Sequence, residues 1–213
     1  MKRLVLICVL CALILPVASA QSVSIGAKIG GGPAFLSGSD FKDFLATVNG
    51  YNEVRFGFTA GAFLNFETAE WCSVQAELMY SLAGGAFSYY DPDFFDDSDW
   101  KITASALELP VLLMLKPRAG KGEIRIFAGP DLIIILGDIE YEVRTLGLVF
   151  SIDIEPDNIF VFGLKGGIGY AHPLGKGELV VDFCYTRSIT EIFEDDNTAV
   201  NVPMLTVGYQ IGF

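Results

Sequence analysis

Hydrophobic and polar positions alternate strictly at the end of the chain. From Leu205 to Phe213, every odd position is apolar or aromatic, and every even position is Thr, Gly or Gln. A period of two residues predicts a β-strand with one apolar and one polar face. In a water-soluble sheet, a helix or a second sheet would cover the apolar face. The rest of the chain therefore decides what this strand packs against.

Seven upstream segments repeat the alternation, and no segment shows a sustained helical period. Their lengths are close to the ~10 residues that a tilted strand needs to cross a membrane. The eight predicted strands cover residues 22–36, 53–66, 71–82, 101–115, 123–136, 159–170, 178–186 and 200–213.

Long and short connections alternate between these strands. This pattern is typical of outer-membrane barrels, so the expected fold is all-β, an eight-stranded antiparallel up-and-down transmembrane β-barrel. The third long connection contains two strand-like stretches, which we expect to form a hairpin beyond the membrane. A ten-stranded barrel that uses 139–155 as an extra pair is the alternative. The long connections are 37–52, 83–100, 137–158 and 187–199, and the strand-like stretches are 139–144 and 148–154.

Composition separates a barrel in lipid from a soluble one. The chain is 52% hydrophobic, but no run of 18 apolar residues follows residue 20, so helical membrane spans are excluded. A soluble barrel or sandwich would turn its polar positions to solvent. Those positions are rich in Gly, Ala and Ser and poor in Lys and Glu, so we expect the apolar face to contact lipid.

The first twenty residues have the order of a secretory signal peptide. Lys2 and Arg3 precede an apolar stretch, 4–17, and Ala18-Ser19-Ala20 resembles a cleavage site. Residues 1–20 are therefore the predicted signal peptide, and 21–213 the predicted outer-membrane barrel domain.

Charge and cysteine content exclude several classes of function. Without Lys2 and Arg3, twelve basic and 26 acidic residues remain, a net charge of −14. Such an acidic chain is unsuited to nucleic acid, whose binding requires neutralised phosphates. Cys72 and Cys184 alone make no disulfide framework, and no spacing matches a metal site or a cofactor motif.

Charged residues of both signs occupy the polar alternate positions of the predicted strands, which we expect to face the barrel interior. The interior of an eight-stranded barrel is just wide enough for side chains to fill, and buried charges must be paired. We therefore expect a structural charge network that plugs the barrel, rather than a catalytic or conducting group. Its predicted members are Lys28, Arg55, Glu77, Glu108, Arg125, Asp131, Lys165 and Asp182.

Several short stretches, in this order and spacing, resemble the PorT-like or "porin family" outer-membrane β-barrel proteins of Bacteroidetes. The stretches span essentially the whole predicted mature chain. They are Gly26-Ala-Lys-Ile-Gly-Gly, Gln75-Ala-Glu-Leu-Met-Tyr-Ser81, Leu107-Glu-Leu-Pro-Val-Leu-Leu113 with Lys116, Phe127-Ala-Gly-Pro130, Gly163-Leu-Lys-Gly-Gly-Ile-Gly-Tyr170, Asp182-Phe-Cys-Tyr185 and Val207-Gly-Tyr-Gln-Ile-Gly-Phe213.

The resemblance implies an eight-stranded barrel with both termini in the periplasm and no catalytic residues. It also implies that Phe213, with Tyr209, forms the terminal aromatic signal read by the barrel-assembly machinery. Pro110 and Pro130 fall within the resembling stretches. A closed barrel offers no edge for a residue that lacks an N–H, so we interpret both as β-bulges.

The chain lacks the residues of the known barrel enzymes. Its one histidine, His172, lies in a predicted short turn before Pro173, and Ser188 and Thr190 have only carboxylates nearby in sequence. No nucleophile, base and orienting group can be assembled from these residues. The sequence therefore predicts no enzyme activity.

Acidic residues concentrate in the four long connections, which together with Glu53 hold eighteen of the 26. The 83–100 connection combines five of them with aromatic residues. A solvated acidic rim explains this composition, and a Ca²⁺-bridged surface or an aromatic partner patch are the alternatives. The spacing matches no defined calcium loop.

Together these features predict a non-enzymatic, integral protein of the outer membrane with a plugged interior. Its role would be envelope structure, surface interaction or support of secretion. A narrow porin-like channel for small solutes is the alternative. The expected surroundings are the lipid bilayer and lipopolysaccharide, with no cofactor and no nucleic acid.

Overall fold

A computed structural model describes residues 20–91, 96–145, 148–190 and 198–213. The predicted signal peptide thus lies almost wholly outside the described residues. Eight of the described strands close into a ring. They are β1 (Ser22–Gly38), β3 (Arg55–Ala69), β4 (Cys72–Asp91), β5 (Asp96–Leu115), β7 (Gly122–Ile135), β10 (Phe160–Leu174), β11 (Gly177–Ser188) and β12 (Thr198–Gly212).

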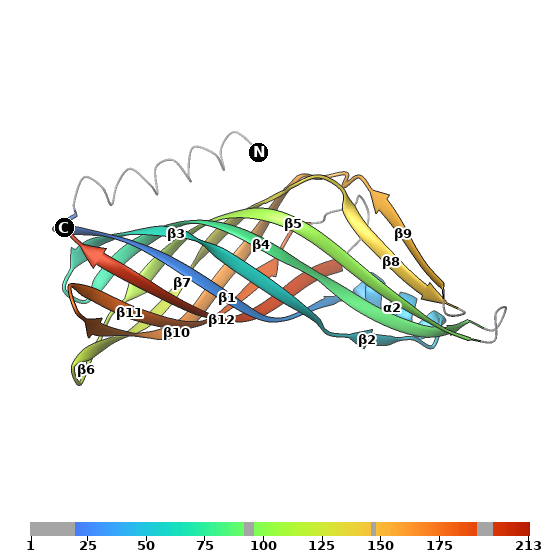
Figure 1. Ribbon diagram of the computed structural model, residues 1–213, viewed down its shortest axis with the longest axis horizontal. Coiled ribbons are helices and arrows are strands. Elements are labelled where there is room, and N and C mark those ends of the chain that lie inside the picture. Colours follow the sequence, from blue (N-terminus) through green and yellow to red (C-terminus); the bar gives the residue numbers. More distant parts are fainter. Residues whose placement is uncertain (1–19, 92–95, 146–147, 191–197) are drawn as a thin grey trace.

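Each strand of the ring pairs antiparallel with its sequence neighbour in the ring, and β12 pairs with β1 to close it. The strands run obliquely around one elongated barrel (Figure 1). The predicted eight-stranded up-and-down barrel is confirmed. The ten-stranded alternative is wrong, because β10 pairs directly with β7 and leaves 139–154 outside the ring.

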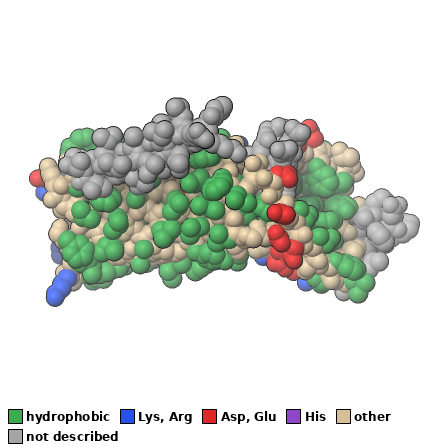
Figure 2. Space-filling model, turned by 90° about the horizontal axis from the view of Figure 1, so that it is seen from above, with side chains coloured by type: hydrophobic (Ala, Val, Ile, Leu, Met, Phe, Trp, Pro, Cys, Tyr) green, Lys and Arg blue, Asp and Glu red, His purple; other side chains and the backbone are tan. Residues whose placement is uncertain are grey.

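Side chains alternate between the lumen and the outer surface, as the period of two requires. Leu113 and Phe183 are exposed on the outside, whereas their neighbours Leu112 and Asp182 are buried in the lumen. Figure 2 shows hydrophobic side chains spread over the barrel wall, with acidic side chains gathered toward one end. The alternate positions that are apolar in the sequence therefore form the outer face of the barrel.

The remaining elements distinguish the two ends of the barrel (Figure 1). The loop end carries helix α2 (Ser39–Thr47), β2 (Tyr51–Glu53), β8 (Ile139–Thr145) and β9 (Leu148–Ile154). The turn end carries β6 (Arg118–Ala119), the short turns and the C-terminus. No helix among the described residues is long and apolar enough to cross a membrane.

Two of the predicted connections are more regular than expected. Residues 37–52 were predicted to form a loop, but they contain α2, in which Phe41, Phe44 and Leu45 lie on one helical face. Residues 83–100 were also predicted to form a loop, but β4 and β5 continue through them in an unbroken register, down to Asp91 opposite Asp96. The predicted hairpin at 139–144 and 148–154 is confirmed, as β8 and β9.

The interpretation of Pro110 and Pro130 as β-bulges is wrong. On both sides of each proline, β5 keeps one register with β4 and with β7. Instead, two residue pairs beside Pro110 are missing from the β4–β5 ladder, and two pairs beside Pro130 are missing from the β5–β7 ladder. A missing N–H thus removes hydrogen bonds locally without shifting the strands.

The seam between β1 and β12 also accommodates prolines without a shift of register. Its register runs from Ser24 opposite Gly212 to Gly31 opposite Leu205, and resumes unchanged at Phe35 opposite Asn201. Pro33 and Pro203 face each other in the gap. The seam closes in register although neither proline can donate a hydrogen bond.

Strand packing leads to a prediction at Gly129 of β7. A Cβ atom there would lie 1.9 Å from the Val111 carbonyl oxygen, whereas one at Gly166 of β10 would lie 3.4 Å from its nearest neighbour. We expect Gly129→Ala to destabilise the barrel by roughly 1–3 kcal/mol through overpacking. Gly166→Ala, with the same backbone effect, should change little. Urea titration of the unboiled, folded gel band measures both, and equal midpoints would contradict the clash.

Candidate functional site in the barrel lumen

A chain of ion pairs crosses the middle of the lumen. Lys28 Nζ of β1 lies 2.6 Å from Glu77 Oε1 of β4, and Lys165 Nζ of β10 lies 3.7 Å from Glu77 Oε2. Lys165 Nζ also lies 3.1 Å from Glu108 Oε2 of β5. Glu77 and both lysines are buried. Four strands are thereby connected across the lumen.

Gln75 links a second group of charges to this chain. Its amide nitrogen donates to Glu77 Oε1 at 2.6 Å, and its carbonyl oxygen accepts from an Arg125 Nη2 at 2.8 Å. Arg125 Nε in turn lies 3.4 Å from Asp182 Oδ1. We call these residues, Lys28, Gln75, Glu77, Glu108, Arg125, Lys165 and Asp182, the charge network.

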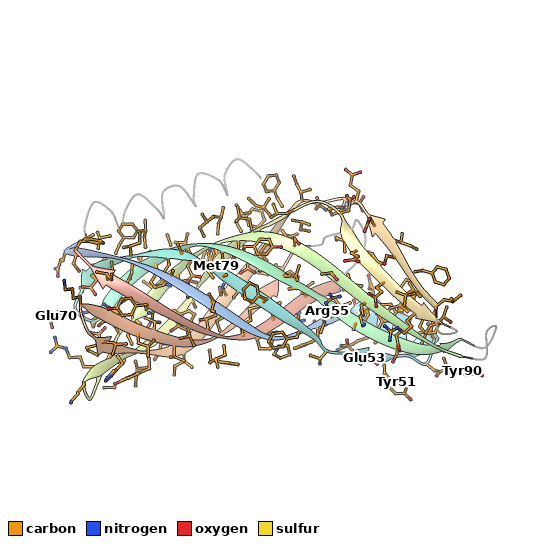
Figure 3. The ribbon with its side chains drawn as sticks, viewed as in Figure 1. Tyr51, Glu53, Arg55, Glu70, Met79 and Tyr90 are labelled. Carbon is orange, nitrogen blue, oxygen red and sulfur yellow. The ribbon has the colours of Figure 1, made fainter. Side chains whose placement is uncertain are left out.

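Two of the predicted members, Asp131 and Arg55, differ from the others in their contacts. Asp131 is fully buried and interacts electrostatically with Glu108 and Lys165, but its carboxylate has no hydrogen-bond donor among the described residues. Arg55 lies nearer the loop end than the network, beyond Met79 (Figure 3). There its Nη1 donates to the Ile102 carbonyl oxygen at 3.4 Å. Seven predicted residues therefore come together, and Arg55 does not join them.

Large side chains fill the space around the network, because glycines at the paired positions of neighbouring strands make room for them. The Phe63 ring covers Gly26, where a Cβ would come within 2.4 Å of it. Phe127 covers Gly167 in the same way, at 2.6 Å. Lys28 Nζ lies 5.8 Å from the centre of the Phe63 ring, a cation–π geometry. Phe63, Phe127 and Met79 are all buried.

The turn end has an ion cluster of its own. The ammonium group of Lys116 is buried against the carboxylate of Glu67 and lies 3.6 Å from Glu123 Oε2. Ser22 Oγ donates to the second Glu67 oxygen at 2.6 Å. This cluster ties the start of β1 to the strand ends at the turn end.

Above the charge network, toward the loop end, the lumen is apolar and incompletely filled. A cavity of about 250 Å³ lies between α2 and strands β1, β4, β5, β8 and β12. A smaller one of about 70 Å³ adjoins it and reaches Glu108. They share Gly84, Ala104 and Val200 as lining residues. We call the two cavities together the chamber.

Aromatic side chains form one wall of the chamber. Phe87 of β4 stacks on Trp100 of β5 with ring centres 5.7 Å apart. Phe41 and Phe44 of α2 meet Phe87 edge to face at 5.8 and 5.5 Å. The contacts of Phe87 hold the helix against the hairpin of β4 and β5.

Sequence reasoning missed Gln75 and the chamber. Gln75 lies on the inward parity of β4 between Ser73 and Glu77, so its position was readable. Its neutral side chain, however, gave no reason to include it in a charge network. The chamber is not evident in the sequence, because the sequence predicts loops where α2 and the upper parts of β4 and β5 lie.

The candidate catalytic and metal-binding residues are not assembled into a site. His172 lies exposed near the β10–β11 turn, whereas Ser188 lies at the opposite end of β11. The hydroxyl oxygens of Ser188 and Thr190 accept hydrogen bonds from the backbone N–H groups of Val200 and Phe162. Over the described ranges, no three acidic, His or Cys residues group as metal ligands do. Asp93 and residues 191–197, which include four further acidic residues, fall outside those ranges.

The closed ring, its polar lumen and its apolar outer face define a membrane-spanning β-barrel, because so large an exposed apolar surface is not found on soluble monomers. The family model described as "Outer membrane protein beta-barrel domain" matches residues 19–194. The chain belongs to this family. It is therefore a protein of the outer membrane, and its outer face contacts the lipid bilayer.

Several solved structures are similar to this chain, at low sequence identity. Ail, the attachment invasion locus protein of Yersinia pestis, is 14% identical over 90% of this chain and 100% of its own, with a TM-score of 0.40. OprG from Pseudomonas aeruginosa is 13% identical over 92% and 97%, with a TM-score of 0.49. Neisserial surface protein A is 12% identical over 90% and 97%, with a TM-score of 0.39. Comparison with curated proteins gave no match.

The charge network leads to a prediction of stability. Glu77→Ala leaves Lys28 and Lys165 buried with fewer partners, and removal of one member of a buried pair typically costs about 3–5 kcal/mol. Glu70→Ala is the matched control, because Glu70 pairs with Arg118 at 3.5 Å on the surface, where ion pairs contribute little. Urea unfolding followed by tryptophan fluorescence measures both. Equal losses in the two variants would show that the network does not hold the barrel together.

Proposed function

We propose that this protein is a closed, non-enzymatic outer-membrane barrel that acts through its loop end. Its role is in envelope structure, in interaction at the cell surface, or in support of secretion, as the resemblance to PorT-like proteins of Bacteroidetes implies. The observation that carries the proposal is the charge network. It connects six strands across the lumen through ion pairs and hydrogen bonds among largely buried side chains.

A lumen that is filled at the level of the charge network favours a structural barrel over a pore. Conduction needs a continuous water path, and an eight-stranded barrel has little room beyond its own side chains. Here Phe63, Met79 and Phe127 occupy what space the network leaves. A narrow channel for small solutes is the alternative, and it requires Lys28 or Lys165 to leave its buried carboxylate partner.

The absence of an assembled catalytic set, within the part of the chain described, supports a non-enzymatic role. His172 and Ser188 are separated by the length of β11. The two hydroxyl groups considered as nucleophiles already accept backbone hydrogen bonds. None of these groups is therefore poised for nucleophilic attack.

In this proposal the turn end faces the periplasm and the loop end faces the exterior, beside lipopolysaccharide. Residues 1–20 direct export. The C-terminal strand presents Tyr209 outward, and Phe213 is 82% exposed. An accessible terminal aromatic is suited to recognition by the barrel-assembly machinery. Both residues therefore serve assembly.

The loop end offers a surface for partners. Strand β9 ends the sheet on one side, and every residue of β9 is exposed. Phe150, Ile152 and Ile154 lie on one face of it. An edge strand of this kind pairs readily with another chain, which supports an interaction role for the loop end.

Conductance distinguishes the closed barrel from a channel. We expect the folded protein in planar bilayers to give no steady ion-selective openings, because the charge network closes the lumen. Folding is verified on the same sample by the mobility difference between unboiled and boiled protein on a gel. Steady, ion-selective openings by the folded protein would refute the closed-barrel proposal.

Labelling determines the orientation. We expect Ser151→Cys in β9 to react with a membrane-impermeant maleimide on intact cells. Lys121→Cys in the turn between β6 and β7 should react only after the outer membrane is broken. The unsubstituted chain, whose Cys72 faces lipid and whose Cys184 is buried, gives the background. The reverse pattern would place the loop end in the periplasm.

A further inference from the structure

The chamber has the properties of a ligand site, which the proposed function does not use. Its larger part, of about 250 Å³, opens at the loop end and is lined mainly by apolar side chains, as small-molecule pockets are. An apolar cavity of ~150 Å³ accommodates benzene. We infer that the chamber binds an uncharged, apolar molecule of about ten carbon atoms, in proportion to its volume.

The walls of the chamber favour an apolar ligand over water. An ordered buried water needs two to four polar partners. The walls are mostly hydrocarbon, and the Asp40 carboxylate already accepts a hydrogen bond from Ser39 Oγ at 3.0 Å. Tyr141 and Thr198 also have interaction partners of their own. The apolar lining residues are Leu36, Phe41, Phe44, Phe87, Ile102, Ile139 and Val200.

Charge around the chamber argues against an anionic ligand such as a fatty-acid anion. Asp40 lies in the upper wall, and Glu108 lies in the floor, where Lys165 is already bonded to it. A carboxylate brought into this space would meet like charge without a free cation from the floor. An uncharged ligand has no such cost.

The entrance lies beside α2. Phe44 lines the chamber and is also 43% exposed, so it stands between the cavity and the exterior of the loop end. Trp100, stacked on Phe87 of the chamber wall, lies one ring away from the bound molecule. Its fluorescence therefore reports occupancy.

The test uses Trp71→Phe, which leaves Trp100 as the single tryptophan of a chain that has two. The protein is placed in lipid nanodiscs and titrated with 1-bromodecane, whose bromine quenches indole fluorescence on contact. We expect quenching that saturates at one molecule per barrel. Quenching that rises linearly without saturation would mean partition into the bilayer only, and would overturn the inference.

Matched variants locate the binding. Ala104→Phe fills the chamber from β5 and should weaken binding at least about ten-fold. Ala62→Phe makes the same change on the exposed outer face of β3 and should leave binding unchanged. Val200→Phe fills the chamber from β12, so the result does not depend on the folding of one variant. Equal affinity in all folded variants would overturn the inference.

The source of the ligand is distinguished in the same nanodiscs. If an acyl chain of the bilayer enters the chamber, brominated phospholipid alone should quench Trp100 fluorescence, and Ala104→Phe should abolish this quenching. If a dissolved molecule is the ligand, 1-bromodecane alone gives that effect. The conductance measurement is separate, so a conducting barrel would leave this inference standing.

Discussion

Closure of the ring between β1 and β12 is the constraint on which the rest of the structure depends. In lipid, no water is present to satisfy a backbone N–H or C=O group, so a spanning sheet must leave no edge. The seam achieves this in one register from Ser24 to Gly38, although Pro33 and Pro203 face each other within it. A ring of eight strands leaves an interior just wide enough for side chains or one small ligand, and charges buried there must be paired.

The period of two predicted the strands, their faces and the eight-stranded barrel. It could do so because the surroundings outside and inside the barrel differ strongly, so each strand alternates apolar and polar side chains along its length. The elements at the loop end were not predictable in this way. Helix α2 has nine residues, too few for a helical period to be distinguished from a loop. Residues 139–154 alternate as spanning strands do. Only the direct pairing of β7 with β10 excludes them from the ring.

Parity also predicted which charges enter the lumen, but it could not predict their height along the axis. Arg55 begins β3 near the loop end, whereas Glu77 lies well inside β4, and tilt and register decide which of them meet. The pairing of Glu77 with both Lys28 and Lys165 follows from those two quantities. The role of Gln75 follows from geometry alone, since a neutral amide can donate to Glu77 and accept from Arg125 at once.

The division of the lumen into a filled part and a chamber follows from side-chain volume at inward positions. Near the charge network, Phe63 and Phe127 occupy the space that facing glycines leave. Toward the loop end, the inward positions of β4 and β5 carry Ala83, Ala104 and Ala106, and these small side chains line space that stays empty. The wall is held at its distance by backbone pairing, so it cannot collapse inward. A network that closes the barrel and a cavity that opens toward the loop end are thus products of one ring with two different linings.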